Sequence, residues 1–216
     1  MFAGLQQGSV YIDTSTNAPA TMRRIAEIGI SKGFHVLDAP VSGGVVGARE
    51  ATLTVFVGGD KKDFERLQPL MKCMGRNVVY MGAAGSGNVT KLVNNVMMYI
   101  NFVGACEGMA MAVKAGIDPQ TLLDVINTSL GQSIILERNM GLFLKGEHWD
   151  FATELAVKDM RLGVQLGGET GVPMEISSRV ERVITRFRDE VGPGKDFLEF
   201  MRDFMQRSGV ELPGRP

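Results

Sequence analysis

A glycine-rich stretch followed by a lysine and an asparagine carries the clearest chemical potential in this sequence. Residues 82–95 read GAAGSGNVTKLVNN. Asn88 is a predicted N-cap, because its side-chain oxygen can accept a backbone N–H from the first turn of a helix. Lys91 then lies in that first turn, and Asn95 lies four residues on, along the same helix face. An ammonium donor and an amide would point the same way above a glycine turn, where a ligand can approach the backbone closely.

The expected position of Lys91 favours an amine that gives up its proton easily. The positive end of a helix macrodipole disfavours a cation, and burial lowers the pKa of a lysine further. Such a lysine can act as a general acid or base near neutral pH. A solvated surface lysine after a plain loop is the alternative. A phosphate-binding P-loop is rejected, because it needs Lys directly after its last glycine and three residues separate Gly87 from Lys91.

A second glycine motif, DAPVSGG at 38–44, follows a predicted strand. Polar groups at the carboxyl ends of parallel strands are where α/β sheets bind ligands. Ser42 offers a hydroxyl, and Gly43 and Gly44 leave their backbone amides open to an anion. A plain glycine turn is the alternative. Lys158 and its neighbour Asp159 lie within a predicted apolar helix, where a solvated charged pair is the alternative to a site role.

Composition restricts the class of protein. The 216 residues are 44% hydrophobic and 22% charged with a net charge of -1, which is typical of a globular protein and indicates no nucleic-acid surface. Cys73 and Cys106 form no CxxC pair, which excludes a disulfide framework and favours a reducing, cytoplasmic location. His35 and His148 are isolated, so no metal site is expected.

No signal peptide or membrane span is expected. The first residues lack a basic segment followed by an apolar one. The most apolar run, 93–115, is interrupted by Asn94, Asn95, Asn101 and Glu107, whereas a span needs roughly 20 mostly apolar residues. The run predicts a buried helix, apolar nearly all round, that must be covered on several sides.

The periodicity changes at Gly82, where we place a domain boundary. Residues 1–82 predict an α/β domain, with strands at 10–13, 34–39, 52–57 and 78–81 and helices at 19–32 and 62–74. The strand–helix–strand order predicts a parallel crossover unit. Residues 83–216 predict helices only, at 88–115, 119–128, 133–144, 153–169, 173–189 and 197–207.

Together these motifs resemble the β-hydroxyacid dehydrogenase family, typified by 3-hydroxyisobutyrate dehydrogenase and tartronate semialdehyde reductase. Residues 38–44 are similar to its substrate-binding signature and residues 82–95 to its catalytic signature. Lys158 matches a lysine of the cofactor and substrate cleft, and Thr16 matches a cofactor-contacting position after the first strand. The resemblance covers essentially the whole chain.

The resemblance implies a Rossmann-like domain followed by an all-helical domain for substrate binding and dimerisation. The family opens with a strand, a GxGxxG turn and a helix that hold the pyrophosphate. No GxGxxG occurs here, so residues 1–82 correspond to the later half of the dinucleotide-binding domain. A homodimer or homotetramer is the implied assembly.

The implied reaction is hydride transfer between NAD or NADP and a small 3-hydroxy acid or its semialdehyde. Lys91 would be the general acid/base, with Asn95 beside it. The substrate carboxylate would bind at Ser42, Gly43 and Gly44, while Thr16 and Lys158 would contact the cofactor.

Two other functions stay open. One is a non-catalytic helical module for oligomerisation or binding that has lost its cofactor half. The absence of GxGxxG favours it, and the retained Lys91, Asn95 and Ser42 argue against it. The other is an imine-reducing enzyme on the same scaffold, whose members usually carry a different residue at the position of Lys91.

Overall fold

The computed structural model describes residues 4–210, and its chain divides into two compact units, 1–94 and 95–216. The two units divide within a helix, twelve residues after Gly82, and the domain boundary after Gly82 stays a prediction. The start of this helix belongs to the first unit because it is hydrogen-bonded to the sheet there.

The first unit contains a mixed five-stranded sheet between two layers of helix. Its strands are β1 (Val10–Asp13), β2 (His35–Asp38), β3 (Val41–Ser42), β4 (Thr54–Gly58) and β5 (Asn77–Gly82), and its helices are α1 (Pro19–Ser31), α2 (Gly44–Arg49) and α3 (Lys61–Met71). β1 and β2 are parallel, as are β4 and β5. The parallel crossover expected from the first strands is therefore confirmed.

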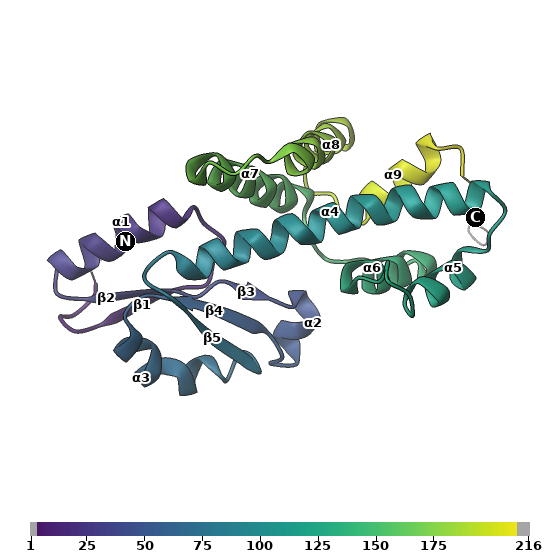
Figure 1. Ribbon diagram of the computed structural model, residues 1–216. Coiled ribbons are helices and arrows are strands. Elements are labelled where there is room, and N and C mark those ends of the chain that lie inside the picture. The colour runs from purple at the N-terminus through teal and green to yellow at the C-terminus, as the bar shows by residue number, and fades with distance from the viewer. Residues whose placement is uncertain (1–3, 211–216) are drawn as a thin grey trace. The chain divides into compact units, whose positions relative to one another are not determined.

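Alternation along β2 places its side chains in two separate cores. Val36 packs in a cluster with Met22 of α1, whereas Leu37 packs in a cluster with Phe64 of α3. Figure 1 shows the same arrangement, with α1 and α3 on opposite faces of the sheet. The sheet is thereby covered on both sides, and its strand ends are left to form loops at the edge.

The segment after β2 differs from the expected loop. β3 pairs antiparallel with β4, and α2 begins at Gly44. Both elements were missed, because a two-residue strand and a six-residue helix are too short to show a hydrophobic period. The predicted strands and helices elsewhere in the unit are found with their ends shifted by at most three residues.

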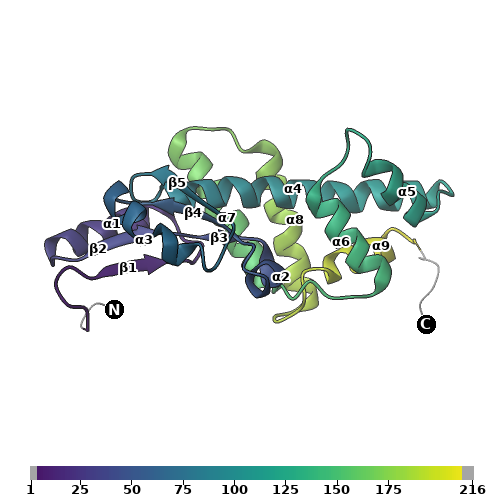
Figure 2. The same cartoon turned by 90° about the horizontal axis from the view of Figure 1, so that it is seen from below.

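The second unit is all-helical, as expected. α4 (Ser86–Lys114) starts in the first unit and continues into the second, which adds α5 (Pro119–Ile126), α6 (Ile134–Lys145), α7 (Thr153–Thr170), α8 (Glu175–Val191) and α9 (Glu199–Arg207). α5 packs against α6 and α7 against α8 (Figure 2). Asp118 and Ser133 accept backbone N–H groups at the starts of α5 and α6, which explains where these helices begin.

α4 supplies one side of the core of this unit. Its Tyr99, Phe102 and Cys106 are fully buried, and the Phe102 ring lies 5.0 Å from that of Phe197. Met97 and Met111 on α4 are 60% and 72% exposed, so the expected cover on several sides is only partly provided by this chain. Among residues 4–210, α4 is the one helix long and apolar enough to cross a membrane, a test that the core helix of a soluble protein also meets.

Candidate active site

A buried carboxylate at the end of β2 organises the first unit's candidate site. The Asp38 side chain is 1% exposed. Its oxygens accept the Gly85 N–H at 2.7 Å, the Asn88 N–H at 2.8 Å and the Asn88 Nδ2 at 3.3 Å. These donors belong to the turn before α4 and to its first turn. Because the N-terminal end of a helix attracts an anion, Asp38 bonds the start of α4 to the sheet.

The loop after β1 is held by hydrogen bonds to the side chains of Asp13 and Asn88. Asp13 accepts the Ser15 N–H at 2.8 Å and also the Ser15 hydroxyl. At the other end of the loop, the Asn17 N–H donates to Asn88 Oδ1 at 2.7 Å. Thr16 lies between these two anchors and is half-buried. The loop that carries Thr16 is therefore bonded both to its own strand and to α4.

Two glycines make room for the Asp38 carboxylate. A Cβ on Gly87 would lie 2.3 Å from the Phe56 carbonyl oxygen and 2.7 Å from that of Asp38. A Cβ on Gly58 would lie 2.4 Å from Asp38 Oδ1. Since side chains at these positions would collide with fixed backbone or with the carboxylate, the close approach of α4 to the sheet requires glycine. At Gly85 a Cβ would lie 2.9 Å from the Pro19 carbonyl oxygen, and the φ of +91° also favours glycine.

The start of α4 corrects two expectations. The helix begins at Ser86, so Lys91 lies in its second turn rather than its first. Asn88 is not the N-cap; its side chain contacts Asp38 and Asn17 instead. The helix begins earlier than expected because Asp38, fifty residues away in sequence, accepts the N–H groups that a local cap would otherwise take.

A second polar group forms where α4 meets α7 in the helical unit. Asn95 is 2% exposed, and its Nδ2 donates to Asp159 Oδ2 at 2.7 Å. Lys158 Nζ lies 3.0 Å from Asp159 Oδ1. Burial raises the pKa of the nearby Tyr99 well above its usual range, and the Asp159 charge raises it further, so its phenol stays protonated. The structure thus brings Asn95 and Lys158 together through Asp159.

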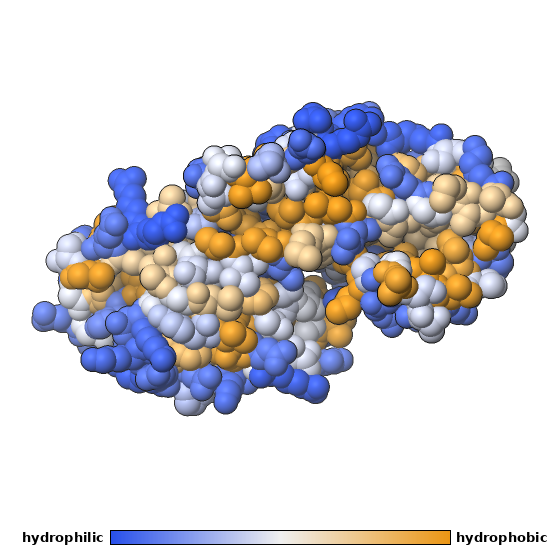
Figure 3. Space-filling view, viewed as in Figure 1, coloured by the Kyte–Doolittle hydropathy of each residue, from blue (hydrophilic) through white to orange (hydrophobic). Residues whose placement is uncertain are grey.

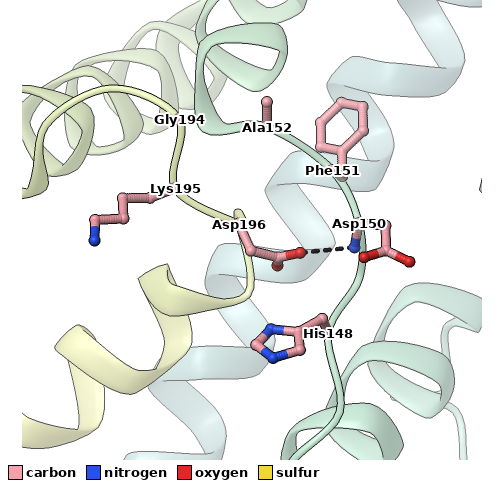
Figure 4. Close-up of a pocket in the computed structure, with 7 residues that line it drawn as sticks. All are labelled: His148, Asp150, Phe151, Ala152, Gly194, Lys195 and Asp196. Carbon is pink, nitrogen blue, oxygen red and sulfur yellow. Dashed lines mark hydrogen bonds between the residues drawn. The ribbon is translucent and has the colours of Figure 1, made fainter.

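A hollow of about 370 Å³ on the helical unit does not gather a catalytic set. It lies where the segments around Asp150 and Asp196 run side by side, joined by a bond from the Asp150 N–H to Asp196 Oδ2 at 2.6 Å. Figure 4 shows the Lys195 amine pointing away from both carboxylates. Residues 4–210 also hold no cluster of three or more His, Cys, Asp or Glu side chains that could bind a metal.

Two family models match the chain along most of its length. Residues 1–82 match the NAD binding domain of 6-phosphogluconate dehydrogenase. Residues 85–204 match the model described as NAD-binding of NADP-dependent 3-hydroxyisobutyrate dehydrogenase. The second match alone spans more than half of the chain. The chain belongs to the β-hydroxyacid dehydrogenase family.

Individual relatives agree with this assignment. The 2-(hydroxymethyl)glutarate dehydrogenase of Eubacterium barkeri is 30% identical over 99% of this chain and 72% of its own length. The 3-hydroxyisobutyrate dehydrogenase of Pseudomonas aeruginosa is 47% identical over 56% of this chain and 40% of its own. The structure of Mycobacterium tuberculosis 3-hydroxyisobutyrate dehydrogenase with L-serine superimposes with a TM-score of 0.85 at 28% identity, covering 94% of this chain and 72% of that one. The chain thus spans part of the length of each relative.

The cofactor of this β-hydroxyacid dehydrogenase family chain is NAD or NADP. The first unit fits one end of such a molecule, because the Thr16 loop and Ser42 follow the carboxyl ends of β1 and β2, where α/β sheets bind nucleotides. The GxGxxG turn that holds a pyrophosphate does not occur in the 216 residues. Thr16 and Lys158 are the predicted cofactor contacts.

The structure shows hydrogen bonds of three residues that the motifs alone did not reveal, two in the first unit and one in the second. Asp38 stood only as the first letter of a substrate signature, Asn88 as a helix cap, and Asp159 as one half of a charged pair. The sequence offered one signal, which is that Asp38 is an acidic residue at the end of an apolar strand and before a glycine turn. This signal could not reveal the hydrogen bonds, because the bonded residues are about fifty or more positions apart in the sequence.

Replacing Gly87 with alanine tests the close approach of α4 to the sheet. We expect Gly87→Ala to destabilise the first unit by about 2 kcal/mol or more, since the new Cβ meets backbone oxygens, as overpacking does. Urea unfolding followed by circular dichroism measures this. Gly141→Ala, in the interior of α6 with nothing within 4 Å of its Cβ, is the control and should stabilise by up to about 1 kcal/mol. Equal effects of the two changes would contradict the packing argument.

Proposed function

We propose that this chain interconverts a small 3-hydroxy acid and its semialdehyde by NAD(P)-dependent hydride transfer. The observation that carries the proposal is the network of Asp38 and Asn88, which ties the Thr16 loop to the helix that carries Lys91. The loop that carries Thr16 and the start of the helix that carries Lys91 are thereby bonded to each other and to the end of β2. Membership of a dehydrogenase family supports the same reaction class.

Lys91 is the proposed acid and base. NAD or NADP accepts or supplies the hydride at the alcohol carbon. During oxidation the Lys91 amine takes the hydroxyl proton, and during reduction the Lys91 ammonium returns it to the carbonyl oxygen. Asn95 follows one turn later on the same face of α4, and its amide is held in one orientation by Asp159. That amide is suited to hydrogen-bond the reacting oxygen or to hold the lysine side chain.

The segment after β2 is the proposed carboxylate site. Ser42 presents a half-buried hydroxyl, and Gly43 and Gly44 are exposed, with φ values of +136° and +66°. Their backbone amides can therefore be approached by a carboxylate without interference from side chains. The M. tuberculosis relative was determined with L-serine, which carries a carboxylate and a hydroxyl on its third carbon. A substrate of this shape suits the residues present.

Lys158 is the proposed cationic contact to the cofactor. Its amine is 3.0 Å from Asp159, and its side chain is 43% exposed. The paired carboxylate orients the amine, and the positive charge of a lysine suits an anionic group of the cofactor. A cytoplasmic location remains a prediction from the isolated cysteines.

We also propose that the chain forms a homodimer or homotetramer through its helical unit. Large apolar side chains are exposed on three of its helices and their connections, namely Met111, Val125, Leu130 and Ile134. Figure 3 shows such residues gathered over α5 and α6. Exposed apolar surface of this kind is typical of protein interfaces. A second copy of the chain would cover it.

Removing the proposed acid and base should abolish most turnover. We expect Lys91→Ala to lower kcat by about 10²- to 10⁴-fold, which is about 3–5 kcal/mol of barrier. Lys91→Arg should fail as well, because arginine does not release its proton. The measurement is NAD(P)-linked oxidation of a panel of 3-hydroxy acids, with circular dichroism as the check on folding. Lys114→Ala, in the last turn of the same helix, is the control, and near-normal turnover of Lys91→Ala would refute the role.

Cofactor binding separates an enzyme from a non-catalytic module. We expect the chain to bind NADH or NADPH, because the nicotinamide side of the site is built from its own residues. Titration followed by nicotinamide fluorescence measures this. A module kept only for assembly would bind neither nucleotide, and that result would favour the alternative function.

The state of assembly is read by multi-angle light scattering at micromolar concentration. We expect a mass of two or four chains, and we expect Met111→Glu to shift it toward one chain, because a buried carboxylate is costly at an apolar interface. Leu70→Glu, which changes an exposed leucine of α3, is the matched control. A monomeric unmodified chain would overturn the proposed assembly.

A further inference from the structure

We propose that Asn88 is a positioning residue that locks the cofactor-side loop to the helix bearing the acid and base. This inference rests on the proposed function. Asn88 touches neither reacting group; it acts through Asn17 on one side and Asp38 on the other. Thr16 is the direct neighbour of Asn17, and Lys91 lies three residues after Asn88 on α4.

The contacts of the Asn88 side chain join parts that are distant in sequence. The side chain is 0% exposed. Its Oδ1 accepts the Asn17 N–H at 2.7 Å across 71 residues, and its Nδ2 lies 3.3 Å from Asp38 Oδ2. A single amide therefore bonds the loop after β1 and the end of β2 to the first turn of α4.

The chemistry of these two neighbours calls for an amide at this position. Asn17 presents a donor and Asp38 presents a charged acceptor, so the bridging group needs an acceptor at one end and a donor at the other. A carboxylate would repel Asp38, and an alkyl group would offer neither atom. The amide meets both demands.

The start of α4 does not depend on this side chain alone. The backbone N–H groups of Gly85 and Asn88 still reach Asp38 when the side chain is removed. What the side chain adds is the bond to the loop. Its loss should therefore loosen the Asn17 end of the loop while leaving the helix in place, which separates positioning from general stability.

The rate of hydride transfer is sensitive to motion of the loop that carries Thr16. A misplacement of about 1 Å between reacting groups can cost about 100-fold in rate. A loop that moves relative to Lys91 would spoil the alignment of the cofactor with the alcohol carbon, whose hydroxyl proton Lys91 would take. The expected signature is a lower kcat with little change in KM for the hydroxy acid, because Asn88 does not touch the substrate.

The test compares Asn88→Ala with Thr90→Val, which deletes a side-chain bond to Ser86 within the same helix turn. In Asn88→Ala we expect amide hydrogen exchange at Asn17 to rise about tenfold or more, with exchange at Gly85 changed less than about threefold. We expect kcat to fall about tenfold at nearly unchanged KM. Thr90→Val should change neither quantity.

Three outcomes would overturn the proposal. The first is Asn17 exchange in Asn88→Ala within twofold of the unmodified chain. The second is an equal rise at the β4 amides of Val55 and Val57, which would indicate general destabilisation. The third is a freed loop with unchanged kcat. If the unmodified chain binds no nucleotide and shows no turnover, the proposed function fails instead, and the exchange comparison still decides whether Asn88 holds the loop.

Discussion

The buried charge of Asp38 is the constraint on which the first unit depends. A carboxylate removed from water is costly unless hydrogen bonds and an opposing field compensate it. Here the compensation comes from peptide N–H groups at the start of α4 and from one side-chain amide. The arrangement works only if the helix starts directly against the end of β2. The hydrogen bonds that compensate the Asp38 charge therefore also determine where α4 begins.

The glycine pattern follows from this constraint. Gly58 on β4 and Gly87 on α4 face the carboxylate and the neighbouring carbonyl groups at distances that no Cβ could occupy. Gly85 supplies a backbone conformation that other residues rarely adopt. The motif that looked like a ligand-binding turn is thus equally a packing motif. The same turn leads into the helix that carries Lys91, the proposed acid and base.

The helical unit also contains a buried hydrogen bond between an aspartate and an asparagine of α4. Asn95 and Asp159 form a buried amide–carboxylate bond between α4 and α7, and Lys158 pairs with the same carboxylate. In both units a buried aspartate orients an asparagine of α4. The long helix consequently carries two polar anchors within its first three turns, and beyond them an aromatic core that contains Tyr99 and Phe102. Its apolar residues pack in the core of the helical unit, and the polar residues near its start form the buried hydrogen bonds.

Much of this protein could be predicted from the sequence alone, because local periodicity and turn residues determine which elements exist. The periodic spacing of apolar residues predicts the helices α4 to α9 and every strand of the sheet except β3. The candidate residues Thr16, Ser42, Lys91, Asn95 and Lys158 come from short motifs and from the family resemblance, and their roles stay predictions. Only the tertiary structure shows the hydrogen bonds of Asp38, Asn88 and Asp159. It also shows that α4 begins at Ser86, so that Lys91 lies in the second helical turn and not in the first. The reason is physical: a helix end can be satisfied by a group from a distant strand, and a hydrogen bond between residues 17 and 88 leaves no trace in the local pattern of either.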